Sequence, residues 1–94
     1  MLELQVQDGG AVRLIGRLDA AEAGQLQMAL DAIPGPVTLE CSALDYISSA
    51  GISVILLTHR RVTAAGSTLT LVGLNPRVRS VFTLANLDKV FVIQ

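Results

Sequence analysis

The sequence predicts one α/β domain that spans residues 1–94. Two kinds of segment follow one another along the chain. In one kind, apolar and polar residues alternate, as in half-buried strands; in the other, apolar residues recur at helical spacing. The chain has 94 residues, 51% of them hydrophobic, which is enough for one core and too few for two. The expected order is β-β-α-β-α-β-α-β. Strands joined through helices form a parallel or mixed sheet, covered by helices on at least one side.

The first two segments predict an antiparallel hairpin. In residues 2–7, apolar side chains alternate with Glu and Gln, which is the period of a strand. Asp8-Gly9-Gly10 is typical of a turn between hairpin strands. Residues 12–18 alternate less regularly and form the expected second strand.

A helix is expected next, over residues 21–32. Its apolar residues recur at helical spacing, and Asp19 is placed to cap its N-terminus. Pro34-Gly35-Pro36 ends the helix and turns the chain. Residues 37–41 are then expected to form a short third strand.

The remaining elements follow the same alternation. A second helix is expected over residues 50–65, and residues 68–72 alternate as a fourth strand. Asn75-Pro76 has the order of an N-cap followed by a first helical residue, so a third helix is expected there. Residues 90–93 are apolar and form the expected last strand.

Composition excludes several classes of function. The formal net charge is −1, and the basic pairs Arg60-Arg61 and Arg77/Arg79 fit solvated helix faces, so nucleic acid is not expected as a direct partner. The single cysteine, Cys41, is expected as a buried apolar residue, and no Cys/His cluster has the spacing of metal ligands. No apolar run reaches the roughly 20 residues of a membrane-spanning helix, and no secretion signal is recognisable. We therefore expect a cytoplasmic protein with no cofactor, no metal and no membrane contact.

Residues 44–57, Leu-Asp-Tyr-Ile-Ser-Ser-Ala-Gly-Ile-Ser-Val-Ile-Leu-Leu, form the most distinctive stretch. It predicts the end of a strand, a tight turn and the N-terminus of a helix. Ser48 and Ser49 stand where a side-chain oxygen can accept hydrogen bonds from the free amides of a first helical turn. The small Ala50 and Gly51 leave room for another backbone or a phosphate to approach. Either hydroxyl can therefore be a cap, a nucleophile or a phosphate acceptor.

A catalytic serine is not expected. The only histidine, His59, lies at least two turns along the second helix, roughly 15 Å away at ~1.5 Å per residue. No Gly-x-Ser-x-Gly motif and no Walker-type phosphate loop are present. His59 stands beside two arginines and is expected to be solvated, so the chain is not expected to be an enzyme.

A phosphate acceptor is the alternative that a helix N-terminus favours. The helix dipole and the free N–H groups stabilise a phosphoserine there, so the fold would tolerate the modification. The phosphate would add about −1.5 to −2 charges beside Asp19 and Asp45 and repel a partner that depends on close contact. From spacing alone, a purely structural capping role for Ser48 and Ser49 stays open.

Three segments resemble the STAS family, and more narrowly its bacterial anti-sigma factor antagonists: Asp45-Tyr46-Ile47-Ser48-Ser49-Ala50-Gly51-Ile52, Gly16-Arg17-Leu18-Asp19-Ala20 and Leu84-Ala85-Asn86-Leu87-Asp88-Lys89-Val90-Phe91. The resemblance covers nearly the whole chain and implies a mixed β-sheet with helices packed mainly on one side. It also implies that the domain binds a serine-kinase anti-sigma factor with the histidine-kinase-like ATPase fold, which frees a sigma factor. Phosphorylation of a loop serine by that kinase then ends binding, and a serine phosphatase restores it.

The resemblance carries over to particular residues. The family loop usually reads Asp-Ser-Ser-Gly or Asp-Ser-Thr-Gly, with the acceptor hydroxyl directly before the Gly. Here Ala50 stands before Gly51, which implies an acceptor shifted by one residue, to Ser49, with Ser48 as second choice. Asp19 matches a family position near the loop that contains Ser48 and Ser49, called the serine loop below. There it either orients the kinase or its nucleotide and metal, or only caps its helix. The partner-binding residues implied are Asp19, Asp45, Tyr46, Ala50, Gly51 and Ser53.

A second function belongs to a different class. The domain could be a STAS subunit of a multi-protein assembly, such as a lipid-transport complex or a stressosome-like scaffold, with no phosphorylation cycle. The small loop and the missing catalytic base fit both functions. Phosphorylation of Ser49 by a neighbouring kinase would separate them.

Overall fold

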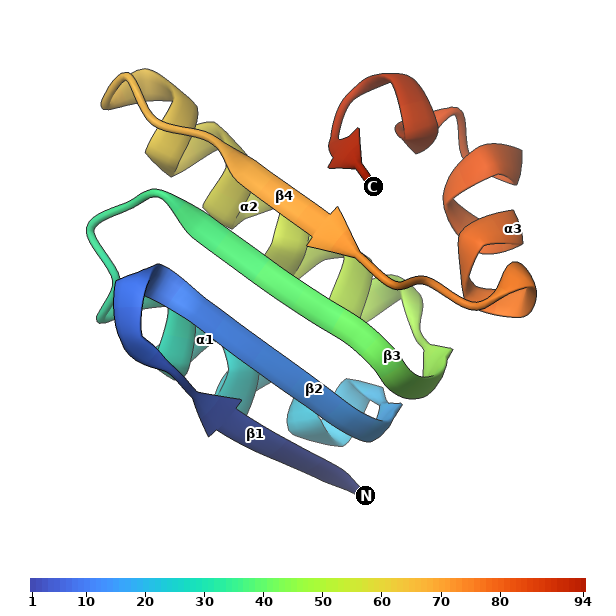
Figure 1. Ribbon diagram of the computed structural model, residues 1–94. Helices are drawn as coiled ribbons and strands as arrows, with labels where there is room; N and C mark the ends of the chain where they lie inside the picture. The colour runs from blue at the N-terminus through green and yellow to red at the C-terminus, as the bar shows by residue number, and fades with distance from the viewer.

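The computed structural model describes residues 1–94 and contains one five-stranded mixed sheet in the order β1-β2-β3-β4-β5 (Figure 1). Only β1 and β2 pair antiparallel; the other neighbours are parallel. The predicted α/β class and the predicted order of elements are therefore confirmed. The strands and α-helices are Leu2–Val6 (β1), Ala11–Leu18 (β2), Ala23–Asp31 (α1), Val37–Ile47 (β3), Ser49–Ala64 (α2), Leu69–Val72 (β4), Pro76–Leu84 (α3) and Val92–Ile93 (β5).

The N-terminal hairpin has the predicted antiparallel pairing, from Leu2↔Gly16 to Val6↔Val12. A short 3₁₀ turn over Asp8–Gly10 joins its strands. The two glycines in this turn have φ angles of 75° and 80°, a region that side chains with a Cβ avoid. Their presence explains why the chain reverses here in so few residues.

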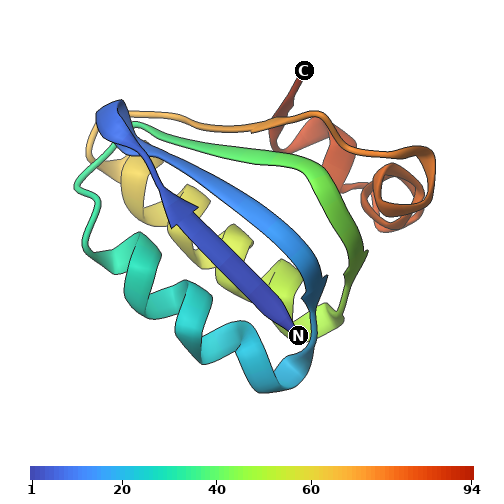
Figure 2. The ribbon, with the colours of Figure 1, turned by 60° about the horizontal axis from the view of Figure 1, so that its bottom comes forward.

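Helices α1 and α2 lie side by side against one face of the sheet (Figure 2). Each turns its apolar side inward; α1 buries Leu26 and Leu30, and α2 buries Val54, Ile55 and Val62 among others. Together with the inward side chains of the strands, and with Val78, Phe82 and Phe91 from the chain after β4, these residues form a core of 19 buried apolar side chains. This layer holds the N-terminus of α2 at the carboxyl ends of β2 and β3.

Helix α1 begins later than predicted. Ala20–Glu22 form a 3₁₀ turn, and the α-helix runs only over Ala23–Asp31. Asp19 precedes the turn with an extended backbone, and its side chain makes no capping hydrogen bond. The prediction that Asp19 caps this helix is therefore wrong.

Strand β3 runs without a break over Val37–Ile47 and joins the predicted strand 37–41 to the strand end predicted at the start of residues 44–57. Between Arg13 and Arg17, β3 twice has one more residue than β2 in their register. These β-bulges change the spacing of the buried residues from two to three, at Cys41, Leu44 and Ile47. Strict alternation therefore detects only the first half of the strand.

Helix α3 lies beside the end of β3, apart from the layer of α1 and α2 (Figure 2), and the chain then returns so that β5 pairs with β4. Asn75 caps α3 as predicted, since its Oδ1 accepts a hydrogen bond from Val78 N at 2.8 Å. The same side chain donates through Nδ2 to the carbonyl of Leu44 at 2.9 Å. Asn75 thus both starts α3 and ties it to β3.

Contacts between aromatic rings join the chain after β4 to α2. The rings of Phe82 and Phe91 meet edge to face with their centroids 5.8 Å apart, and His59 meets Phe91 at 5.2 Å. The ring of His59 is half-buried, so its predicted solvated position is wrong. None of the helices is both long and apolar enough to cross a bilayer.

Candidate functional site

Ser48 links the end of β3 to α2 and acts as the helix N-cap. Its backbone is extended, with φ −90° and ψ 167°, and its Oγ accepts a hydrogen bond from Gly51 N at 3.1 Å. Its own N–H donates to the carbonyl of Leu18 at 2.9 Å, which ties the loop to β2. The half-buried Ser48 hydroxyl is therefore already used by the fold.

Ser49 is the first residue of α2, and its side chain is exposed. Its hydroxyl makes no hydrogen bond within the domain, while its carbonyl accepts one from Ser53 Oγ at 3.0 Å. Ser53 is also exposed and lies one turn further along the same side of α2. The loop thus presents one free hydroxyl, on Ser49, at a helix N-terminus.

Gly51 is buried, and its small size serves packing inside the domain. A Cβ at this position would lie 2.6 Å from Leu18 Cγ and 3.3 Å from Ile47 Cγ1. The room expected for an approaching partner is therefore filled by the domain's own Leu18. Ala50 is half-buried beside it.

Asp19 and Tyr46 lie near the serine loop, and Arg17 contacts both. Arg17 Nη2 is 3.7 Å from Asp19 Oδ1, and the Arg17 guanidinium lies over the ring of Tyr46, 4.2 Å from its centroid. Arg17 and Tyr46 are register partners on β2 and β3. The structure therefore brings predicted residues together through an arginine that sequence reasoning did not select.

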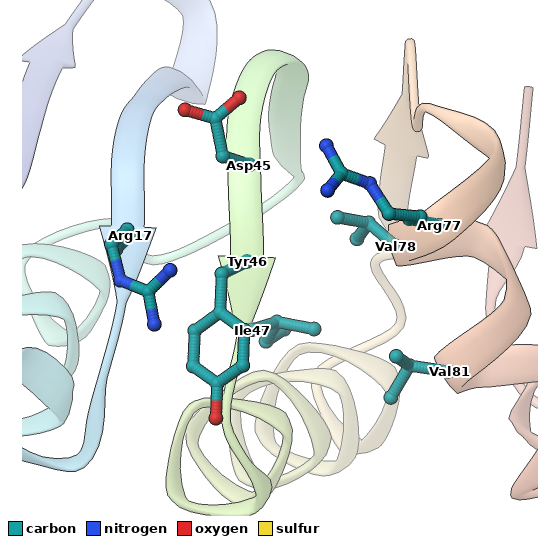
Figure 3. Close-up of a pocket in the computed structure, with 7 residues that line it drawn as sticks. All are labelled: Arg17, Asp45, Tyr46, Ile47, Arg77, Val78 and Val81. Atoms are coloured by element: carbon teal, nitrogen blue, oxygen red, sulfur yellow. The ribbon is translucent and has the colours of Figure 1, made fainter.

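A pocket of about 290 Å³ opens between the ends of β2 and β3 and helix α3 (Figure 3). Side chains of β3 and of α3 form its apolar wall, and its charged groups are two arginines and Asp45. Neither Asp45 nor Arg77 forms an ion pair. The lining residues are Arg17, Asp45, Tyr46, Ile47, Arg77, Val78 and Val81.

No local sequence pattern predicts that the ends of β2 and β3 lie next to helix α3. Arg77 reads as part of a solvated helix face, whereas α3 is held against β3 by the tether from Asn75 to Leu44 and by burial of Val78 and Phe82 in the core. Tyr46 and Asp45 were selected from the sequence, whereas Arg17 and Arg77 were missed. The contact of Arg17 with Tyr46 depends on the bulged register, which the sequence does not reveal.

The chemistry available here is binding and modification of a hydroxyl. Ser48 and Ser49 have no hydrogen bond to a basic side chain, and His59 contacts Phe91 instead. The free amides at the start of α2 and its dipole favour negative charge beside Ser49. Arg17 and Arg77 add positive charge near the same end of the sheet.

Sequence comparisons place the chain among known proteins. The family model described as "Mlab, STAS domain" matches residues 3–94. BtrV of Bordetella bronchiseptica, which is named as an anti-sigma factor antagonist, is 36% identical over 84 residues, covering 85% of this chain and 72% of BtrV.

Solved structures share the fold. TM1081 of Thermotoga maritima, also named as an anti-sigma factor antagonist, superposes with a TM-score of 0.81 at 23% identity, covering 98% of this chain and 84% of that one. The anti-sigma factor antagonist SpoIIAA in its unphosphorylated form gives 0.72 at 18% identity, covering 100% and 87%. Phosphorylated SpoIIAA from Bacillus gives 0.69 at 21% identity, covering 100% and 91%.

The family model covers all but the first two residues, and BtrV agrees with it over most of the chain. The structural neighbours have the same arrangement of sheet and helices. The chain therefore belongs to the STAS domain family, together with the bacterial anti-sigma factor antagonists.

Proposed function

We propose that this STAS domain is an anti-sigma factor antagonist that is switched off by phosphorylation of Ser49. In the cytoplasm, the unmodified domain binds a serine-kinase anti-sigma factor with the histidine-kinase-like ATPase fold, and this binding frees the sigma factor. The kinase phosphorylates Ser49 and the complex separates. A serine phosphatase then restores the binding form.

The observation that carries this proposal is the division of roles between the two serines. Ser48 uses its hydroxyl to cap α2, whereas the Ser49 hydroxyl is exposed and unbonded. A kinase needs an accessible hydroxyl, and the helix N-terminus stabilises the phosphate that results. Ser49 can therefore be charged while the cap stays in place.

The proposed partner surface surrounds this hydroxyl. Ser49 and Ser53 present the exposed side of α2, and Asp45 and Tyr46 continue the surface along β3. A phosphate on Ser49 would place about −1.5 to −2 charges at its centre. Ala50 lies at the edge of this surface, half-buried Asp19 flanks it, and Gly51 supports it from beneath.

The relatives support the proposal. BtrV is named as an anti-sigma factor antagonist, and SpoIIAA has been solved in both unphosphorylated and phosphorylated forms. Both forms superpose on this chain over its whole length. A phosphate is thus compatible with this fold in a protein of the same architecture.

The test is to incubate the domain with ATP and a serine-kinase anti-sigma factor of the ATPase fold from the same organism, and to locate phosphate by mass spectrometry. We expect one phosphate on the wild type, none on Ser49→Ala, and one on the matched control Ser48→Ala. Phosphate retained on Ser49→Ala would contradict the assignment of Ser49. An unmodified wild type would contradict the switch itself.

A second candidate function is a STAS subunit of a larger assembly without a phosphorylation cycle. Ala50 favours it, because the usual acceptor hydroxyl directly before the glycine is absent. For this function, we expect the domain to remain unphosphorylated and to co-purify with a membrane ATPase.

A further inference from the structure

We propose that Arg17 pairs with the phosphate on Ser49 and, in doing so, leaves the ring of Tyr46. Phosphorylation would then change the shape of the partner surface as well as its charge. This inference rests on the proposed modification of Ser49. It concerns what the phosphate does once it is present.

Arg17 is placed close to the serine loop by backbone hydrogen bonds. The next residue, Leu18, accepts the hydrogen bond from Ser48 N at 2.9 Å, so the end of β2 and the start of the loop lie side by side. Figure 3 shows the Arg17 guanidinium beside the ring of Tyr46, both directed toward the end of the sheet where α2 begins. The Arg17 side chain therefore extends from the strand end that is bonded to the serine loop, on the face of the sheet opposite to the buried Leu18 side chain.

The present contacts of Arg17 are weak. Its distance of 3.7 Å from Asp19 Oδ1 is too long for a hydrogen bond, and its side chain is 54% exposed. Its other contact is the stacking on Tyr46. Contacts of this kind at an exposed site contribute little, so a stronger anion can displace them.

A phosphoserine is such an anion. It carries three acceptor oxygens and close to two charges, and it forms bidentate hydrogen bonds with a guanidinium. Asp19 and Asp45 would repel the phosphate, which increases the advantage of a nearby cation such as Arg17. The planar guanidinium of Arg17 can form two hydrogen bonds with a phosphate, whereas it now lies 3.7 Å from a single carboxylate oxygen.

The other arginines are less suited to this role. Arg13 is held by Glu40 at 3.1 Å, and Arg61 donates to the Leu30 carbonyl at 2.8 Å. Arg77 is free, but it comes from α3 and lies across the pocket from Arg17 (Figure 3). Arg17 alone is weakly held and sits on the strand that is bonded to the serine loop.

The displacement of Arg17 affects Tyr46, a residue that is 40% exposed and whose ring is covered on one face by Arg17. When Arg17 moves to the phosphate, that face of the ring becomes free and Asp19 loses its cation. Both residues belong to the proposed partner surface. Because the chain has one tyrosine and no tryptophan, intrinsic fluorescence reports on Tyr46 alone.

The test installs phosphoserine at position 49 during synthesis of the full chain, so that no kinase is needed. ³¹P NMR then gives the pKa of the phosphate, which lies near 6 when unperturbed. We expect Arg17→Gln to raise this pKa by about half a unit relative to the phosphorylated wild type. The matched control Arg13→Gln, on the same strand, should leave it unchanged.

Tyrosine fluorescence and the aromatic NMR signals of Tyr46 provide the second readout. We expect phosphorylation to change them in the wild type and in Arg13→Gln. It should leave them nearly unchanged in Arg17→Gln, where the ring is already uncovered. Thermal unfolding of each variant checks that the fold is intact.

Equal phosphate pKa values in the wild type and Arg17→Gln would overturn the pairing. A rise in Arg77→Gln instead would also overturn it and assign the phosphate to α3. If the kinase does not modify Ser49, the proposed function fails, whereas these measurements on installed phosphoserine still decide the role of Arg17.

Discussion

At the scale of single residues, Ser48 and Ser49 are adjacent and chemically identical, yet the fold uses only the first. Loss of an N-cap hydroxyl leaves an amide of the first helical turn without its partner and typically costs about 1 kcal/mol. Ser48→Ala should therefore lower the free energy of unfolding by about 1 kcal/mol, because its Oγ accepts from Gly51 N. Ser49→Ala should change it by less than about 0.5 kcal/mol. Urea unfolding of the two variants checks this, and an equal loss in both would contradict the assignment of the cap.

The charge on Ser49 should act on binding more than on folding. Ser49→Asp places a carboxylate at the helix N-terminus, where the dipole favours it, so the melting temperature should stay within a few degrees of the wild type, about the effect of 0.5 kcal/mol. Affinity for the kinase partner, measured by calorimetry, should fall at least about tenfold, equivalent to about 1.4 kcal/mol. Unchanged affinity would count against an electrostatic switch.

Gly51 and Gly24 provide a matched pair of helical glycines. Alanine in place of glycine normally stabilises a helix by about 0.5–1 kcal/mol. A Cβ at Gly24 would have no neighbour within 4 Å, so Gly24→Ala should show this gain. At Gly51 the Cβ would lie 2.6 Å from Leu18 Cγ, and we expect a net loss of about 1–2 kcal/mol. Denaturant unfolding of the two variants measures these changes in stability. A gain at both positions would show that Leu18 moves aside freely.

Sequence reasoning succeeded at this scale where the physics is local. A cap depends on residues within one turn, so Asn75 could be placed from its neighbours alone, whereas the sequence left the cap of α2 open between Ser48 and Ser49. It failed for Gly51 and Arg17, because the atoms that explain them belong to other strands. The cap predicted at Asp19 failed although it is local, because Ala20–Glu22 form a 3₁₀ turn and the α-helix begins only at Ala23.

At the scale of elements, the serine loop is positioned by two devices. The bulges carry β3 forward to Ile47, and Asn75 fastens α3 to the second half of that strand. The predicted order of elements is correct because it needs only the type of each segment. It was not predictable that residues 37–41 and the strand end expected at the start of residues 44–57 form one strand, because bulges depend on pairing with a strand distant in sequence.

The two hydrogen bonds of Asn75 can be separated by mutation. Asn75→Asp keeps the oxygen that accepts from Val78 N and removes the donor to the Leu44 carbonyl. Asn75→Ala removes both. We expect losses of about 1 kcal/mol for the aspartate and about 2–3 kcal/mol for the alanine. Equal losses in urea unfolding would show that the tether to β3 contributes nothing.

At the scale of the whole molecule, the sheet should open only when the domain unfolds globally. Cys41 reports on this, because it lies on the central strand β3 and is 1% exposed. Burial raises the pKa of its thiol to about 12, and the neighbouring Glu40 carboxylate adds to the rise. A buried, protonated thiol reacts with alkylating reagents far more slowly than a free one.

Alkylation of Cys41 should therefore require global unfolding. At about pH 8, its rate should fall below that of the unfolded chain by the unfolding equilibrium constant, and mass spectrometry measures it. The pH dependence of the free energy of unfolding follows from the same burial of the Cys41 thiol. The folded pKa lies above the ordinary value of 9.0, so as pH rises from 9 toward 12 the unfolded chain ionises first. The free energy of unfolding should thus fall over this range, by up to about 1.4 kcal/mol per pH unit from this group, and stay unaffected by it below. Alkylation faster than global unfolding permits would show that β3 separates locally from its neighbours, and the serine loop would then lack the rigid support that positions Ser49.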